Sequence, residues 1–215
     1  MTTQAVAAAE RAALCDTFDE VGPDAPTLCS PWLTRDLAAH LVLRERRPDL
    51  AFGMWVPMLS ERLEREQADL AAGTDWAELV DRVRGGPPVW HPTQIGLIDD
   101  AFNTLEFFIH HEDVLRAEPD FTARELPPEI ADGVWTALKR MSKVLFRRFD
   151  AGLVLAAPGF GRVAVKPPSK KGSVTVTGAP GELALLAFGR ARVADYEARG
   201  SKKATLALEL AAKGL

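Results

Sequence analysis

The sequence has little of several residue types, and each scarcity argues against a class of protein. Its 215 residues include only two cysteines, Cys15 and Cys29, so a disulfide-stabilised extracellular scaffold does not fit. No stretch approaches the roughly 18 consecutive apolar residues of a membrane-spanning helix. The N-terminal segment MTTQAVAAAERAAL lacks the charged region that opens a secretion signal, and Glu10 and Arg11 interrupt it. These absences predict a cytoplasmic protein with free thiols.

Positive charge is also limited. The chain has 26 Lys and Arg residues against 30 Asp and Glu residues, which gives a net charge of −4. Nucleic-acid binding requires a basic surface that neutralises phosphates, so we expect no nucleic-acid partner. The 47% of hydrophobic and 26% of charged residues match an average soluble protein, and the length allows one large domain or two small ones.

The first 150 residues show the three- and four-residue apolar spacing of helices. We expect Thr34 to be the N-cap of the second helix and residues 89–93 to form a loop. Pro48 should kink or break the chain, so that the helix at 49–71 is either a continuation of the second helix or a third helix. The expected helices span 3–20, 34–45, 49–71, 75–84, 95–117 and 128–148.

The pattern changes after Asp150. The runs LVLAA, RVAVK and SVTVT are short, rich in β-branched residues and separated by Pro and Gly, which is typical of strands. Two further helices are expected at 180–191 and 203–212. The sequence therefore predicts an α+β protein with a helical domain over 1–150 and a small α/β domain over 151–215.

The helix expected at 95–117 carries a polar stripe. A rotation of 100° per residue places five polar side chains within roughly 80° of one another. They are Asp99, Asn103, Glu106, His110 and Asp113. Aromatic and aliphatic residues flank the stripe instead of Lys and Arg, so we expect it to face into the protein.

A metal site is one interpretation of this stripe. Glu106 and His110 are one turn apart and could direct an oxygen and a nitrogen to one divalent cation. An ordinary pair on the helix surface is the alternative. His40, on the apolar side of the second helix, could supply a third ligand if the two helices lie in one bundle, although a core histidine is the alternative for it. Three protein ligands leave a fourth position for water or substrate.

The other polar residues and the cysteines are not expected to be main ligands of this metal site. Asp113 could accept a hydrogen bond from the nitrogen of His110 that does not bind metal. His111 points about 100° away from His110, and His91 lies in an expected loop, so neither is assigned as a ligand. Cys29 could be a fourth ligand, but we interpret both cysteines as buried hydrophobic residues.

Two segments resemble a known family. TLCSPWLTRDLAAHLVLRERRPD and LEFFIHHEDVLRA resemble the metal-binding N-terminal domain of mycothiol-dependent maleylpyruvate isomerases, within the DinB-like four-helix superfamily. That family has a W-T-x-R-D-x-x-x-H-L helix and a later E-x-x-x-H, which match His40, Glu106 and His110; Leu33 here separates Trp32 from the threonine. A longer signature, made of RERRPD, the GPPVW stretch and FFIHHEDV, is similar to an actinobacterial branch of metal-binding proteins, and this resemblance covers nearly the whole chain. Its C-terminal segment VTVTGAPGELALLAFGRARVADYEARG resembles a sterol-carrier-like domain.

The resemblance implies a function. A DinB-like four-helix bundle would bind a divalent metal, zinc by preference, and a low-molecular-weight thiol such as mycothiol. The thiol would attack a small electrophile, in isomerisation or in thiol transfer. Arg44, on the His40 face, is the candidate for binding the thiol cofactor, and a solvated helix end is its alternative role. The alternative function is a non-catalytic metal-containing module that binds an apolar ligand through its C-terminal domain.

Overall fold

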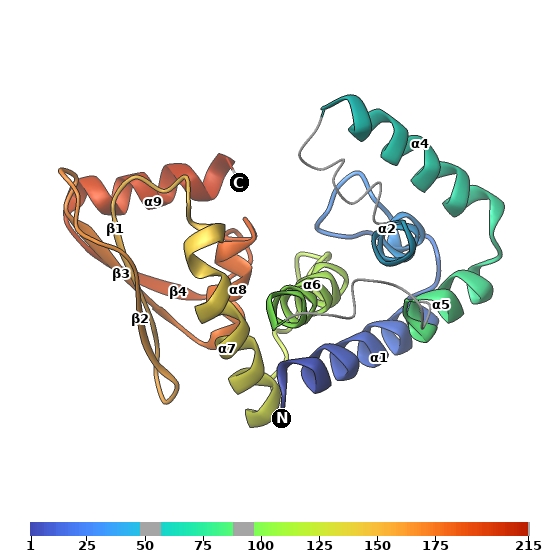
Figure 1. Ribbon diagram of the computed structural model, residues 1–215, viewed down its shortest axis with the longest axis horizontal. Coiled ribbons are helices and arrows are strands. Elements are labelled where there is room, and N and C mark those ends of the chain that lie inside the picture. Colours follow the sequence, from blue (N-terminus) through green and yellow to red (C-terminus); the bar gives the residue numbers. More distant parts are fainter. Residues whose placement is uncertain (48–56, 88–96, 215) are drawn as a thin grey trace. The chain divides into compact units, whose positions relative to one another are not determined.

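The computed structural model describes residues 1–47, 57–87 and 97–214, and these form an α+β fold, as the sequence predicts (Figure 1). The helices are α1 (Thr3–Val21), α2 (Thr34–Arg46), α4 (Pro57–Gly73), α5 (Trp76–Gly85), α6 (Leu97–Leu115), α7 (Pro128–Leu145), α8 (Pro180–Ala187) and α9 (Lys202–Gly214). The strands are β1 (Gly152–Ala157), β2 (Gly161–Lys166), β3 (Ser173–Gly178) and β4 (Tyr196–Gly200). None of the helices in these ranges is long and apolar enough to span a bilayer.

Helix α8 ends four residues before the position expected from the sequence. Gly189 adopts a left-handed conformation with φ of 82°, and the Arg190 N–H donates to the Leu185 carbonyl at 2.9 Å. This arrangement satisfies a carbonyl at the helix end and turns the chain away. Four predicted features lie outside the described residues: the kink or break at Pro48, the loop 89–93, and the first residues of the helices predicted at 49–71 and 95–117.

The prediction that Thr34 is the N-cap of α2 is wrong. Leu33 holds the cap position with an extended backbone, and its N–H donates to Asp36 Oδ2 at 3.0 Å. The Thr34 hydroxyl instead donates to the Gly22 carbonyl at 2.6 Å. Thr34 therefore secures the loop that precedes the helix, which is a role that the local sequence does not reveal.

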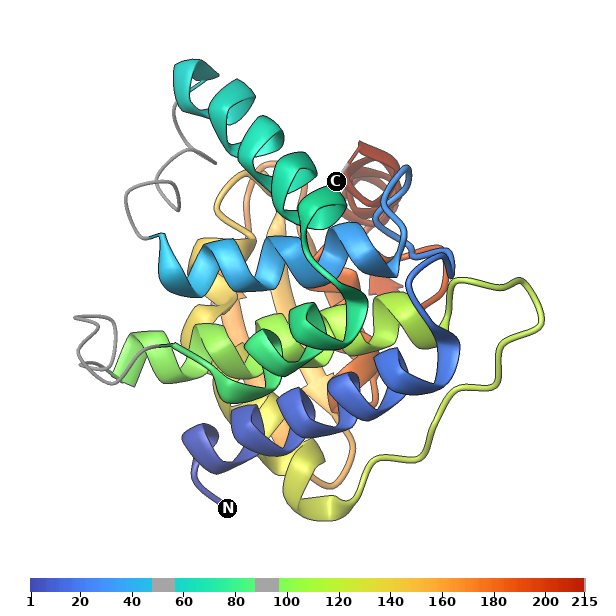
Figure 2. The ribbon, with the colours of Figure 1, turned by 90° about the vertical axis from the view of Figure 1, so that its right-hand side faces the viewer.

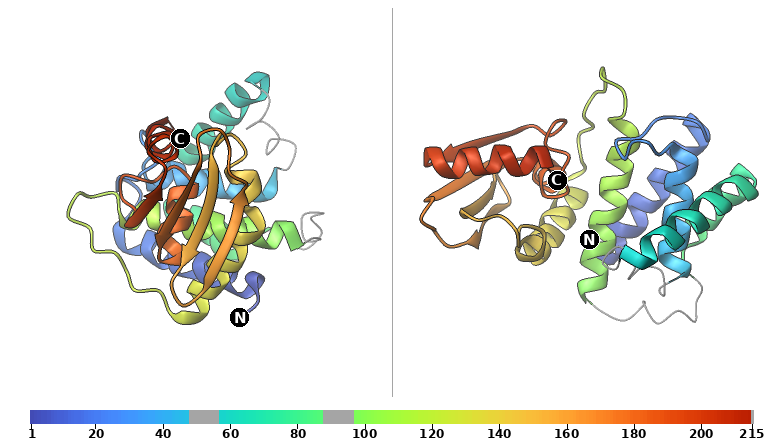
Figure 3. Two further views of the ribbon diagram at one scale, coloured as in Figure 1. Left: turned by 90° about the vertical axis from the view of Figure 1, so that its left-hand side faces the viewer. Right: turned by 90° about the horizontal axis from the view of Figure 1, so that it is seen from above.

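The four strands form one mixed sheet in the order β2-β1-β3-β4. β1 is antiparallel to β2 and parallel to β3, and β3 is antiparallel to β4. On one face Leu153, Leu155, Val174 and Val176 are buried, and Figure 3 shows the sheet in view. The sequence did not predict β4, because this edge strand is polar and mostly exposed and so lacks the apolar alternation of a strand.

The chain divides into two compact units. One contains residues 1–8, 96–109 and 124–215, and the other contains 9–95 and 110–123. In the first unit α7 packs against α8 and β2, and α9 packs against β3 and β4. The sheet and α7 therefore belong to the same compact unit. Independent folding of residues 1–150 stays a prediction.

The second unit holds α2 in place from several sides. Helices α4 and α5 both pack against α2, and Figure 2 shows α4 crossing it. Arg11 of α1 donates to Glu45 Oε2 of α2 at 2.6 Å and to the Val83 carbonyl of α5 at 2.8 Å. Glu45 is buried, so this hydrogen-bonded ion pair links three helices in the protein interior.

The close approach of α7 and α1 gives a stability prediction. A methyl group added at Gly133 would lie 2.4 Å from Val6 Cγ2 and would clash with it. The Val6 side chain is fully buried and branched, so it has little room to move away. We expect Gly133→Ala to lower the free energy of unfolding by about 1–2 kcal/mol in urea titrations, because overpacking outweighs the helix-propensity gain of about 1 kcal/mol. Gly85→Ala is the matched control, since no described atom lies within 4 Å of the added methyl group. Equal stability of the two variants would contradict this packing.

Candidate metal centre

The polar stripe of α6 faces into the protein at three of its residues. Glu106 and His110 are each 7% exposed, and Asp113 is completely buried. Asn103 is half-buried, and the side chain of Asp99 lies outside the described residues. Burying two carboxyl groups and an imidazole costs free energy unless they are paired or bind a cation. The predicted inward orientation is therefore confirmed for three of the five residues.

His40 of α2 meets this stripe. Its ring centroid lies 5.4 Å from that of His110, with the two rings 70° apart. Glu106 comes one turn before His110 on the continuous helix α6, and the ligand atoms of these three residues all lie within 4.8 Å of one another. Ligands of a tetrahedral zinc ion are separated by about 3.4 Å, so small side-chain rotations would allow all three to reach one cation.

The orientation of His110 is set by Asp113. His110 Nδ1 and Asp113 Oδ2 are 2.9 Å apart, which is the contact that the sequence predicted. A buried aspartate accepts a hydrogen bond, so the partner assigns the proton to Nδ1 and the lone pair to Nε2. Asp113 is itself held, because its backbone carbonyl accepts the Leu28 N–H at 2.9 Å. Nε2 is then the nitrogen of His110 that is available to a metal ion held together with His40 and Glu106.

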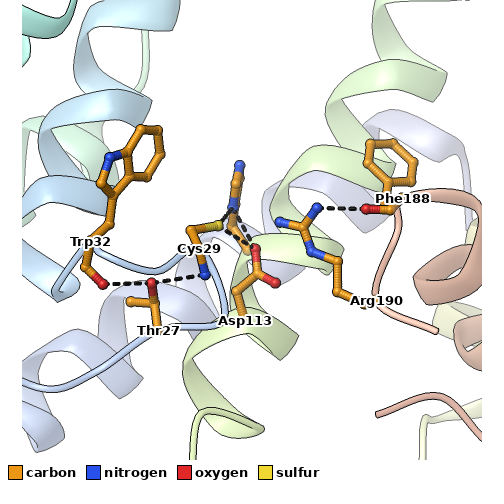
Figure 4. A network of polar contacts seen from close by, with 7 residues as sticks. Thr27, Cys29, Trp32, Asp113, Phe188 and Arg190 are labelled. Carbon is orange, nitrogen blue, oxygen red and sulfur yellow. Dashed lines mark hydrogen bonds and ion pairs between the residues drawn. The ribbon is translucent and has the colours of Figure 1, made fainter. Parts of the chain in front are cut away.

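The loop before α2 adds two residues to the site. The Trp32 ring lies 5.1 Å from the His40 ring at a tilt of 40°. The Cys29 thiol donates to Asp113 Oδ2 at 3.1 Å (Figure 4). The sulfur also lies 4.0 Å from His110 Nδ1. The interpretation of Cys29 as a buried hydrophobic residue is wrong, because the thiol is half-buried and contacts a carboxylate. The sequence could not show this, since the loop conformation brings residues 29 and 113 together.

The remaining candidates take separate places. His111 contacts Glu10 Oε2 at 3.2 Å and Thr17 Oγ1 at 3.0 Å, so it belongs to a different buried network, in line with its exclusion as a ligand. His91 lies outside the described residues. Arg44 is half-buried on α2, and its role in cofactor binding stays a prediction.

The three proposed ligands can be tested by metal analysis. We expect His40→Ala, Glu106→Gln and His110→Ala each to weaken metal binding by more than the roughly 10–100-fold typical of an indirect partner. His111→Gln is the matched control from the adjacent position of α6 and should keep its metal. The measurement is the metal content of purified protein, with circular dichroism to confirm folding. Full metal occupancy in one of the first three variants would remove that residue from the site.

The two cysteines should differ in reactivity. Burial raises the pKa of the Cys15 thiol to about 11, so this residue stays protonated and inert at mildly alkaline pH. Cys29 is half-buried and accessible to a small reagent. We expect one thiol per native chain to react with a thiol-specific dye and the second to react only after unfolding. Cys29→Ser should abolish the native reaction, and native labelling that survives this substitution would contradict the burial of Cys15.

No protein-family model, curated protein or solved structure matches this chain.

Proposed function

We propose that this chain is a metal-dependent protein that binds a low-molecular-weight thiol and uses it in isomerisation of, or thiol transfer to, a small electrophile. The observation that carries the proposal is the grouping of His40, Glu106 and His110 around one point in the protein interior. The segments that resemble mycothiol-dependent maleylpyruvate isomerases contain these same three residues, which supports mycothiol as the thiol and a DinB-like bundle as the fold.

The donor set fits a divalent metal of borderline softness. Two imidazole nitrogens and one carboxylate oxygen are ligands that zinc accepts, and three ligands leave a coordination position open. Two neutral histidines and one negative Glu106 would give the loaded site a net charge of +1, which favours an anionic fourth ligand such as a thiolate. When bound there, the metal would lower the pKa of the thiol and so increase the fraction present as the nucleophilic thiolate.

Neighbouring residues of the chain would prepare this site. Asp113 holds the imidazole of His110 in one tautomer and one orientation, as partners of ligating histidines commonly do. The Trp32 ring packs beside the His40 ring, which would limit the rotation of that imidazole. Arg44 follows His40 by one turn on α2 and would offer a guanidinium to a carboxylate of the thiol or the substrate.

The proposed chemistry is a reversible addition. The thiol sulfur forms a bond to one carbon of an activated double bond, and the other carbon takes up a proton. Rotation about the resulting single bond followed by loss of the thiol and the proton completes an isomerisation. Retention of the carbon–sulfur bond gives a thiol transfer instead. The two outcomes place the same demand on the site, which is to hold a thiolate next to an electrophile.

Thiol binding tests this proposal. Cobalt-loaded Cys29→Ser protein, which lacks its own thiol near the site, should develop a sulfur-to-cobalt charge-transfer band on titration with mycothiol. We expect His40→Ala and Glu106→Gln in that background to lose the band, because they remove ligands, and His111→Gln to keep it. The absence of thiol binding in the control protein, together with an apolar ligand that copurifies with it, would overturn the proposal in favour of the apolar-ligand module.

The role of Asp113 gives a second expectation. Asp113→Asn keeps the shape of the side chain and removes its charge, so the metal should remain but bind about 10–100-fold more weakly. Equilibrium competition with a chromogenic chelator measures this change. An unchanged dissociation constant for the metal would show that Asp113 does not support His110.

A further inference from the structure

We propose that Cys29, His110 and Asp113 form a second cation site, which takes thiophilic divalent ions such as Cd²⁺ through the Cys29 sulfur. This site shares His110 with the first set of ligands and uses the opposite nitrogen of its ring. Binding at one site therefore excludes binding at the other, and this part of the inference rests on the proposed function. The geometry of the three residues by itself supports the site.

The three donor atoms already lie close to the separation that a cation requires. Cys29 Sγ is 3.1 Å from Asp113 Oδ2 and 4.0 Å from His110 Nδ1, and these last two atoms are 2.9 Å apart. Tetrahedral zinc with ordinary bond lengths separates such S, N and O ligands by roughly 3.4–3.6 Å. Shifts of about half an ångström would thus convert the hydrogen-bonded cluster into a coordination site. All three residues belong to the same compact unit.

The loop holds Cys29 in this position. The buried Thr27 hydroxyl accepts the Cys29 N–H at 3.2 Å and donates to the Trp32 carbonyl at 2.8 Å (Figure 4). The next residue, Leu28, donates its N–H to the carbonyl of Asp113. One backbone hydrogen bond to α6 and the hydrogen bonds of the Thr27 hydroxyl within the loop therefore hold the sulfur beside Asp113. A preformed arrangement reduces the ordering cost of binding.

Protons and charges balance at this site. In the cation-free protein Asp113 accepts a hydrogen bond from the Cys29 thiol and another from His110 Nδ1. On binding, the thiol proton passes to solvent and the imidazole proton moves from Nδ1 to Nε2, so the ion meets one thiolate, one carboxylate and one neutral nitrogen. These two negative charges neutralise a divalent ion completely, which suits the buried position of Asp113.

The two ligand sets should differ in selectivity. Soft ions prefer the set with a thiolate, whereas ions that favour nitrogen and oxygen prefer His40, Glu106 and His110. A neutral imidazole has one lone pair, so His110 serves either set through one nitrogen at a time. A thiophilic ion at Cys29 would then withdraw His110 from the first set and reduce binding there.

Cadmium titration tests the site directly. The wild-type protein should show an ultraviolet thiolate-to-cadmium charge-transfer band that saturates at one ion per chain. We expect Cys29→Ser to abolish this band, Cys15→Ala to retain it as the matched cysteine control, and Asp113→Asn to weaken the apparent affinity at least about tenfold. His40→Ala and the isosteric Glu106→Gln should keep the band, because neither residue belongs to this set. Circular dichroism confirms that each variant is folded.

Opposite results would overturn the inference. A band that persists in Cys29→Ser assigns the cation to another residue. A band that is lost in both His40→Ala and Glu106→Gln shows that Cys29 is only a further ligand of the first set. Mutually exclusive binding at the two ligand sets is tested with cobalt-loaded protein. Displacement of the cobalt should require at least about tenfold more Cd²⁺ in Cys29→Ser than in the wild type. Failure of the proposed function is distinguishable, because mycothiol binding is measured in Cys29→Ser protein, which lacks this second site.

Discussion

The hydrogen bond between His110 Nδ1 and Asp113 Oδ2 decides which nitrogen of His110 meets the other candidate ligands. With the proton on Nδ1, the lone pair on Nε2 is available on the side of His110 that faces the other two candidate ligands, His40 and Glu106. The loop before α2 also depends on Asp113, through the Leu28 N–H and the Cys29 thiol. A single buried residue, Asp113, thus connects the helix that carries two candidate ligands with the loop that leads to the third, through its carboxylate and its backbone carbonyl.

Burial restricts the partners that the polar groups of α6 can have. Glu106, His110 and Asp113 are almost fully removed from water, where charged and polar groups need defined partners. The same helix satisfies its other histidine separately, since His111 bonds to Glu10 and Thr17. Adjacent histidines therefore enter two networks on different sides of α6. The rotation of 100° per residue explains why only one of them can join the candidate metal centre.

The sequence alone predicted much of the secondary structure and the three candidate ligands. Helical periodicity and the β-branched runs are local features, so they located most helices and three of the strands. β4 was not predicted because an exposed edge strand has no apolar alternation. The predicted end of α8 lay too far along the chain, because the left-handed conformation of Gly189 ends the helix earlier. Glu106, His110 and Asp113 were found because the geometry of one helix fixes their relative positions.

The sequence determined which side chains share a face of α6, since backbone geometry within a helix follows from local spacing. Only the tertiary structure decided that Cys29 lies beside Asp113 and that Trp32 packs beside His40. It also placed Thr34 on the Gly22 carbonyl instead of at the cap of its own helix. These contacts depend on a loop whose path is set by hydrogen bonds to distant backbone groups. No periodic pattern encodes such pairings, because each becomes favourable only after the helices have packed.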